Sequence, residues 1–288
     1  MKTKLSSIVA GTMNWGIWDK NLSTSEMEHL IHICIENQIT TFDHADIYGN
    51  YTTEADFGKA FGKSDIDRKK IQFISKCGIQ NTGARNNIIK HYDYSKDYII
   101  WSAENSLKNL QTDYLDVLLL HRPSPLMKAD EIAEAVAILK KEGKIIDFGV
   151  SNFTASQTEL IREKTEINYN QIQFSATHHE AMLDGNLDYM QLHNIRPMSW
   201  NPLGTVFRED TDQTRRLKKL LAQLVDKYHL GSDSILLAWI LKHPANVIPV
   251  AGTVNIARIQ ALMKAVEMNL DQLDWFAIWT ESMGNKVP

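Results

Sequence analysis

Four residues of this sequence could together transfer a proton to or from a carbonyl oxygen: Asp43, Tyr48, Lys76 and His121. A tyrosine hydroxyl ordinarily has a pKa of about 10, which is too high for easy proton exchange at neutral pH. A neighbouring lysine ammonium lowers that pKa, and a carboxylate paired with the lysine keeps it charged and oriented. A histidine can donate a hydrogen bond to the same carbonyl. The combination predicts general acid–base chemistry with Tyr48 as the acid.

Each of the four residues also has an ordinary structural explanation. Asp43 could cap a turn, Tyr48 is one of nine tyrosines, and His121 follows four apolar residues as a buried core histidine would. Lys76 is harder to explain in this way, because an ammonium at the end of an apolar strand needs a partner. The case for shared chemistry therefore depends on whether the fold brings these side chains together.

The elements that would position these residues are short apolar runs separated by longer segments of helical periodicity. Some runs are almost continuously hydrophobic, as expected of parallel strands covered on both faces. We expect eight strands, at Ser7–Ala10, Thr40–Asp43, Gln72–Lys76, Leu115–His121, Ile145–Val150, Gln171–Phe174, Arg196–Trp200 and Val247–Ala251. Asp43, Lys76 and His121 stand at the C-terminal ends of three consecutive runs, and Tyr48 closely follows the first of these.

Helices with recognisable caps are expected between the strands. They should follow Ser23, Ser95 and Asn255, and should span Asp130–Lys141, Thr154–Glu163, Thr211–Tyr228 and much of the tail Asp271–Pro288. This repetition predicts an α/β fold: a single-domain (β/α)8 TIM barrel over residues 1–288, with the tail as an extra C-terminal helix. A doubly wound open sheet is the alternative. It ordinarily carries a glycine-rich fingerprint after its first strand, and Gly11 to Gly16 does not match G-x-G-x-x-G.

Length and composition fit a globular protein. The 288 residues suffice for a barrel of about 250 residues, and 43% of them are hydrophobic, close to the globular average. A net charge of −4 argues against a nucleic-acid partner held by bulk positive charge. No signal peptide and no run of about 18 apolar residues is present, so no membrane association is expected. The two cysteines, Cys34 and Cys77, are too few for a disulfide framework and favour a cytoplasmic location.

The sequence gives little support for other kinds of catalytic site. Neither a G-x-S-x-G nor a G-x-x-x-x-G-K-[ST] motif occurs, which disfavours the common hydrolases and nucleotide triphosphatases. His178, His179 and Glu180 only superficially resemble metal ligands, because adjacent residues of an extended segment point apart, and no metal is expected. The polar loop Gln80–Tyr94 follows the third strand and should lie at the mouth of a barrel.

Several motifs resemble those of the aldo-keto reductase superfamily, in that family's order and over nearly the whole chain. They are Phe42 to Gly49, Lys76, Leu120 to Pro123, Gly149 to Phe153, Asn170-Gln171 and Pro202 to Gly204. In finer detail the chain is most similar to the bacterial YdhF-type oxidoreductases. The resemblance implies an NADPH-dependent reductase of small-molecule aldehydes or ketones, with NADH as a weaker cofactor. It also implies Tyr48 as general acid, Lys76 and Asp43 as its tuning pair, and His121 as the residue that orients the carbonyl.

The same resemblance implies the residues that bind the cofactor. The carboxamide would be held by Ser151, Asn152 and Gln171, and the nicotinamide ring would stack on Trp200. The pyrophosphate would lie along Asn201, Pro202, Leu203 and Gly204. The adenosine 2′-phosphate would be gripped by Gly252, Thr253, Asn255 and Arg258, which offer short polar donors, a helix N-terminus and a guanidinium. Gly11 and Thr12, after the first strand, complete the expected set.

Two departures from the family pattern lead to further expectations. His44 stands where the family usually has threonine, which is expected to change the wall of the pocket. The segment before the first strand is short, so the β-hairpin that often closes the bottom of the barrel should be reduced or missing.

Two other functions are compatible with the same residues. A member of this superfamily can serve as a cofactor-bound regulatory subunit, although the complete set of four catalytic residues disfavours a purely regulatory role. A barrel aldolase would instead use Lys76 as a Schiff-base nucleophile.

Overall fold

The computed structural model describes residues 3–83 and 85–288. Eight parallel strands close into a barrel in the order β1-β10-β9-β8-β7-β6-β3-β2. They are β1 (Val9–Gly11), β2 (Thr41–Asp43), β3 (Gln72–Cys77), β6 (Leu115–Leu120), β7 (Ile145–Ser151), β8 (Tyr169–Gln173), β9 (Arg196–Trp200) and β10 (Ile248–Ala251). The predicted (β/α)8 barrel is confirmed, and each of the eight expected strands is present with its ends shifted by at most a few residues.

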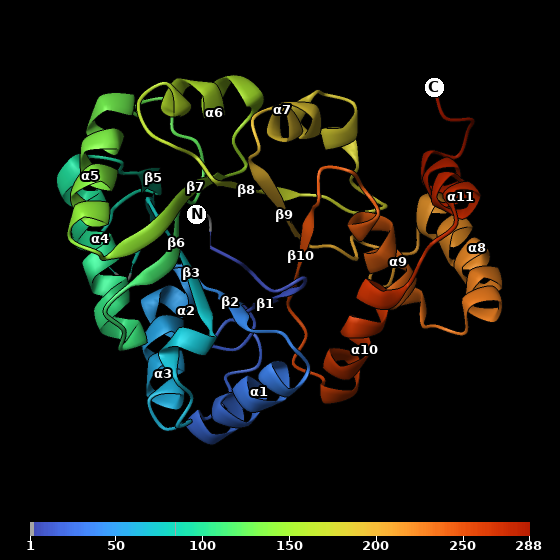
Figure 1. Ribbon diagram of the computed structural model, residues 1–288, viewed down its shortest axis with the longest axis horizontal. Coiled ribbons are helices and arrows are strands. Elements are labelled where there is room, and N and C mark those ends of the chain that lie inside the picture. Colours follow the sequence, from blue (N-terminus) through green and yellow to red (C-terminus); the bar gives the residue numbers. More distant parts are fainter. Residues whose placement is uncertain (1–2, 84) are drawn as a thin grey trace.

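Helices surround the strands as an outer ring (Figure 1). The helices are α1 (Thr24–Glu36), α2 (Tyr48–Tyr51), α3 (Thr53–Phe61), α4 (Lys96–Leu110), α5 (Ala129–Lys141), α6 (Ala155–Arg162), α7 (Asn186–Leu192), α8 (Asp212–Tyr228), α9 (Ser232–Leu241), α10 (Ile256–Glu267) and α11 (Gln272–Met283), with 3₁₀ turns at Arg68–Lys70 and Glu180–Met182. The expected caps are confirmed: Ser23 forms a capping box with Glu26, and the Ser95 and Asn255 side chains accept from the first turns of α4 and α10.

The sequence pattern did not reveal α2, α3, α7 and α9. The reason is clearest for α9, in which seven consecutive residues from Ser234 to Ile240 are buried. A helix that is apolar on all sides has no amphipathic period, so sequence alone cannot distinguish it from a strand. The polar loop after β3 also contains a small antiparallel pair, β4 (Ile79–Gln80) with β5 (His91–Tyr92), which the sequence did not indicate.

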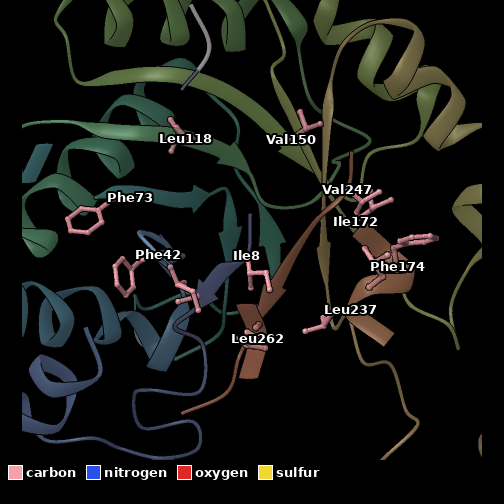
Figure 2. Close-up of a cluster of buried hydrophobic side chains, with 14 of the residues drawn as sticks. Ile8, Phe42, Phe73, Leu118, Val150, Ile172, Phe174, Leu237, Val247 and Leu262 are labelled. Atoms are coloured by element: carbon pink, nitrogen blue, oxygen red, sulfur yellow. The ribbon is translucent and has the colours of Figure 1, made fainter. Parts of the chain in front are cut away.

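Two hydrophobic layers hold the barrel together. The larger fills the space between the outer face of the strands and the helices, and Figure 2 shows part of it, from Phe42 and Phe73 to Phe174 and Leu237. The smaller fills the barrel interior with alternate strand residues, among them Ile74, Leu119 and Met198. Because successive strand residues point to opposite faces, each strand serves both layers. The interior is therefore packed and leaves room for a site only beyond the strand ends.

The N-terminal segment closes the bottom of the barrel without a hairpin. Leu5 packs into the interior layer, the Thr3 amide donates to Asp147 Oδ2 at 2.6 Å, and the Tyr169 hydroxyl donates to the Thr3 carbonyl at 2.7 Å. No strand precedes β1 in the part of the chain that begins at residue 3. The bottom of the barrel is thus covered by extended chain.

The C-terminal helix α11 packs against α8 and α9, at one side of the ring in Figure 1. The rings of Trp239 on α9 and Trp275 on α11 are stacked at 5.1 Å, and each indole N–H donates to the other residue's carbonyl. Helix α11 therefore adds to the outer layer of helices. Within residues 3–83 and 85–288, no helix is long and apolar enough to cross a bilayer.

Candidate active site

The alternation of side chains along the strands gathers the candidate catalytic residues inside the C-terminal end of the barrel. Asp43 follows the outward-facing Phe42, Lys76 lies two residues beyond the inward-facing Ile74, and His121 lies two residues beyond Leu119. Gln171 and Trp200 hold the same inward position on β8 and β9, two residues beyond Tyr169 and Met198. Parallel strands end at the same rim, so five strands deliver side chains to one place.

Lys76 is the centre of a buried hydrogen-bond network. Its Nζ donates to Asp43 Oδ2 at 2.7 Å, to the His44 carbonyl at 2.8 Å and to the Tyr48 hydroxyl at 3.0 Å. The Lys76 side chain is 0% exposed, and these three acceptors use all three of its protons. Burial lowers the pKa of Lys76, but the charge of Asp43 and the contact with Tyr48 outweigh it, so the pKa lies above its usual value. Lys76 is therefore a fixed ammonium.

Tyr48 is held with its hydroxyl directed at this ammonium. It begins α2, a kinked turn in which Gly49 has a φ of +58° and a Cβ would lie 2.4 Å from the Thr53 hydroxyl. This turn requires glycine at position 49. It places the Tyr48 side chain at the C-terminal rim of the barrel. Burial raises the pKa of Tyr48, and the charge of Lys76 opposes this without reversing it. Lys76 thus acts on the pKa of Tyr48 in the expected direction, but burial of the hydroxyl outweighs it, so the pKa lies above its usual value.

His121 lies beside Tyr48 as a neutral imidazole. The two rings meet edge to face at 6.0 Å, and the Nδ1 atom of His121 is buried without a partner among the described residues. Burial, and then the charges of Lys76, Arg122 and Lys90, hold the pKa of His121 well below its usual value. A neutral imidazole keeps one N–H, which can donate to a carbonyl oxygen.

A cleft of about 1110 Å³ opens above these residues. Its walls include most of the candidate set: Gly11, Asp43, Tyr48, His121, Gln171, Trp200, Asn201, Pro202, Leu203, Gly204, Gly252, Thr253, Asn255 and Arg258. This volume exceeds the roughly 300–1,000 Å³ of a drug-sized site, so it can hold a dinucleotide together with a small substrate.

Four candidates are not among the residues that line the cleft. Lys76 is one, covered by Tyr48. The Thr12 hydroxyl donates to the backbone carbonyl of Asp43 at 3.0 Å, and Ser151 Oγ donates to the backbone carbonyl of Gln171 at 3.0 Å. Asn152 Oδ1 accepts from the Trp200 indole at 2.8 Å. These side chains do not line the cleft. Their observed contacts support the residues that do.

Gln171 links the two halves of the site. Its Nε2 donates to Asp43 Oδ1 at 2.9 Å, so both carboxylate oxygens of Asp43 are satisfied, one by Gln171 and one by Lys76. One N–H of this side-chain amide is therefore held by Asp43, and the side-chain oxygen Oε1 of Gln171 is the end left for a ligand.

The loop after β9 forms one wall of the cleft and contains a residue that the sequence did not single out. Arg208 donates to the Asn201 side chain and to the Gly204 carbonyl at 2.7 Å, which closes this loop on itself. Gly204 has a φ of +57°, and a Cβ there would lie 2.0 Å from the Thr177 hydroxyl. Arg208 follows no strand end or motif, so only the folded loop places it at the cleft.

The far end of the cleft is the N-terminus of α10. The Asn255 side chain accepts from the Arg258 amide at 3.0 Å, and the Thr253 hydroxyl accepts from the Asn255 amide at 3.2 Å. The Arg258 side chain is exposed, and no carboxylate of residues 3–83 and 85–288 pairs with it. A free guanidinium beside helix amides suits a phosphate group.

His44 does not reach the pocket, contrary to expectation. It follows the inward-facing Asp43 and therefore points outward, where its ring meets Phe57 at 4.4 Å and Phe73 at 5.7 Å. Its Nδ1 lies 2.9 Å from the Thr12 hydroxyl. Burial holds the pKa of His44 well below its usual value, so it packs as a neutral core ring. No three metal-ligand side chains converge anywhere in the described chain.

Comparison with known proteins identifies the family. A sequence model described as the Aldo/keto reductase family matches residues 7–280. The chain belongs to the aldo/keto reductase family. The resemblance seen in the motifs is thereby confirmed, and the chain is an oxidoreductase homologue by family.

Curated relatives of this aldo/keto reductase family member cover almost its whole length. The "Uncharacterized oxidoreductase YcsN" of Bacillus subtilis is 42% identical over 281 residues, 95% of this chain and 94% of the relative. The "Oxidoreductase YdhF" of Escherichia coli is 39% identical over 277 residues, 95% of this chain and 93% of that protein. A "6-dehydroglucose reductase" of Agrobacterium fabrum is 35% identical over 292 residues, 99% and 97% of the two chains.

Solved structures share the barrel at lower identity. An aldo/keto reductase from Klebsiella pneumoniae in complex with NADP and acetate superposes with a TM-score of 0.78 at 22% identity, covering 95% of this chain and 90% of that one. At this identity the likeness establishes the fold alone.

Proposed function

We propose that this protein reduces the carbonyl group of a small aldehyde or ketone to an alcohol with NADPH. The observation that carries the proposal is the buried contact of 3.0 Å between the Lys76 ammonium and the Tyr48 hydroxyl at the floor of the cleft. A tyrosine placed in this way can donate a proton to a substrate oxygen and leave its own negative charge next to a fixed cation.

Each residue at the floor of the cleft has its own role in the reduction. Tyr48 donates its proton to the carbonyl oxygen as that oxygen gains charge. Lys76 stabilises the phenolate left behind, and Asp43 keeps Lys76 charged. The neutral His121 donates its N–H to the same oxygen and so orients the substrate. A nicotinamide cofactor held in this cleft would supply the hydride for the carbonyl carbon.

The cleft suits a nicotinamide cofactor in three places. The Trp200 indole, fixed by its hydrogen bond to Asn152, offers a flat face for the ring, and Gln171 offers a carbonyl oxygen for the carboxamide. The loop that begins at Asn201 and is closed by Arg208 offers a wall for the pyrophosphate. Arg258 and the N-terminus of α10 suit the 2′-phosphate and favour NADPH over NADH. The Klebsiella structure, which has the same fold, was solved with NADP, and this supports a nicotinamide cofactor in general.

The geometry disfavours an aldolase. A Schiff-base lysine must present a free amine to its substrate, whereas the Lys76 amine is fully buried behind Tyr48 with three acceptors around it. A purely regulatory role is also disfavoured, because a binding subunit has no need of a buried lysine–tyrosine pair at the floor of its cleft.

The test is a screen of aldehydes, ketones and quinones in which NADPH absorbance is followed, with borohydride trapping in parallel. We expect NADPH oxidation that depends on substrate and no covalent adduct at Lys76. No oxidation with any carbonyl compound would contradict the reductase, and a trapped adduct at Lys76 would establish the aldolase instead.

A further inference from the structure

We propose that the physiological substrate is a carbonyl compound that also carries a carboxylate, and that Arg122 binds this carboxylate. The inference rests on the proposed reductase function and names the substrate class for the same cleft. It follows from a guanidinium at the reacting end of the cleft that has no acidic partner.

Arg122 lies next to the groups that would meet the carbonyl. It directly follows His121, it lines the cleft together with Tyr48, and its guanidinium lies 5.6 Å from the centre of the Trp200 ring. Its charge is close enough to lower the pKa of Tyr48 and of His121. A substrate whose carbonyl contacts Tyr48 and His121 would therefore have its next polar group within reach of Arg122.

The Arg122 guanidinium has most of its donors free. Its one hydrogen bond among the described residues is from Nη1 to the His121 carbonyl, a weak contact of 3.3 Å. No carboxylate of residues 3–83 and 85–288 pairs with it, whereas the half-buried Arg68 of the same protein contacts Asp116 at 2.7 Å. Burial lowers the pKa of Arg122, which shows that its position is partly removed from water. A partly buried cation without a counter-ion is costly unless a ligand supplies one.

The surrounding cleft adds positive charge and an apolar wall. Lys90, on the loop between β4 and β5, lines the cleft, and its charge also acts on His121. The apolar residues Ile47 and Ile79, together with Tyr92, form the adjacent lining. The described residues that line the cleft include three acids, and each already has a partner: Asp43 is held by Lys76, Asp19 lies 3.2 Å from Lys20, and Asp233 accepts from the Ser234 amide. This environment suits a short apolar body with a carbonyl at one end and an anion at the other.

The backbone of Arg122 is fixed before any ligand arrives. The Tyr94 hydroxyl accepts from the Arg122 amide at 3.1 Å and donates to its carbonyl. Gly78 permits this, because a Cβ there would lie 1.9 Å from the Tyr94 ring. A guanidinium on a rigid backbone loses less freedom on binding, and its planar fork matches a carboxylate.

The experiment compares two substrates of nearly equal shape, para-carboxybenzaldehyde and its primary amide, with NADPH. The variants are Arg122→Gln, Arg122→Lys and, as a control that removes the same charge on the outer surface of α8, Arg215→Gln. We expect the wild type to prefer the acid by about tenfold or more in kcat/KM, as charged hydrogen bonds allow, mainly through KM. The preference should be lost in Arg122→Gln, partly kept in Arg122→Lys and fully kept in Arg215→Gln.

A second readout separates the two proposals. Calorimetry measures binding of para-carboxybenzyl alcohol, the product of the acid, to wild type and Arg122→Gln in the presence of NADP. Equal turnover of acid and amide by the wild type, or a preference that survives Arg122→Gln, overturns the carboxylate site and leaves the reductase intact. Binding that depends on Arg122, with no NADPH oxidation by these aldehydes or by any compound of the carbonyl screen, supports the carboxylate site and overturns the reductase. Absence of such binding together with absence of oxidation by every carbonyl compound overturns both.

Discussion

The Lys76 ammonium donates to the Tyr48 hydroxyl across 3.0 Å at the floor of the cleft, and Tyr48 separates the lysine from the cleft. Two consequences follow from this single contact. The lysine cannot act as a nucleophile, and the tyrosine keeps its proton at neutral pH, because burial raises its pKa more than Lys76 lowers it. Tyr48 is therefore poised as an acid in the direction of carbonyl reduction.

Tyr48→Phe should lower kcat by roughly 10²–10⁴-fold, the usual contribution of a general acid, while NADPH still binds. The change removes one oxygen and keeps the ring that packs against His121. Steady-state kinetics and a fluorescence titration of NADPH measure the two effects. Tyr189→Phe, on α7, is the matched control and should turn over normally. Near-normal kcat in Tyr48→Phe would remove Tyr48 from the mechanism.

Lys76→Met should lower activity and move the basic limb of the pH–rate profile upward. The Lys76 charge and its hydrogen bond are the main influences that lower the pKa of Tyr48, so their loss leaves burial less opposed. The profile of kcat/KM against pH for both proteins measures the shift, and circular dichroism checks the fold. A normal rate with an unmoved basic limb would mean that Lys76 is only structural.

Arg258→Ala should weaken NADPH binding by about tenfold or more and leave NADH binding nearly unchanged, because only NADPH carries the 2′-phosphate. The exposed Arg215→Ala serves as the control, since it removes the same charge away from the cleft. Dissociation constants of both cofactors for the three proteins decide the matter. Equal affinity of the wild type for NADH and NADPH would refute the assignment.

Asp46→Asn should stabilise the protein increasingly as the pH rises. Burial, together with the neighbouring charge of Glu54, raises the pKa of Asp46 to about 7 against the opposing effect of Arg85. Between about pH 4 and about pH 7 the unfolded state has lost the Asp46 proton and the native state has not, so wild-type stability falls through this window.

The difference in unfolding free energy between Asp46→Asn and wild type should therefore grow by about 1.4 kcal/mol per pH unit in that window and level off above it. Urea unfolding at several pH values measures the difference. The exposed Asp226→Asn is the control and should show no such trend. A difference that is independent of pH would mean that Asp46 is ionised in the native protein throughout.

The local sequence determined the strands, most of the helices and the residues at the strand ends. These features depend on residues close together in the chain, so they can be recognised in the sequence. Examples are the apolar runs, the cap at Ser23, and the positions of Asp43, Lys76 and His121 at the ends of such runs. The uniformly buried helix α9 carries no such period, and it was missed for that reason.

Only the tertiary structure decided which side chains contact each other and in which direction the pKa of Tyr48 is shifted. The pleat turned His44 and Thr12 away from the cleft although they adjoin Asp43 and Gly11, because each residue added to a strand reverses the face. The net direction of the Tyr48 pKa depended on how completely the barrel removes water from its hydroxyl. Whether the Arg122 guanidinium has a counter-ion likewise depends on which acidic side chains the fold brings near it. The sequence does not show this, because those acids are far from Arg122 along the chain.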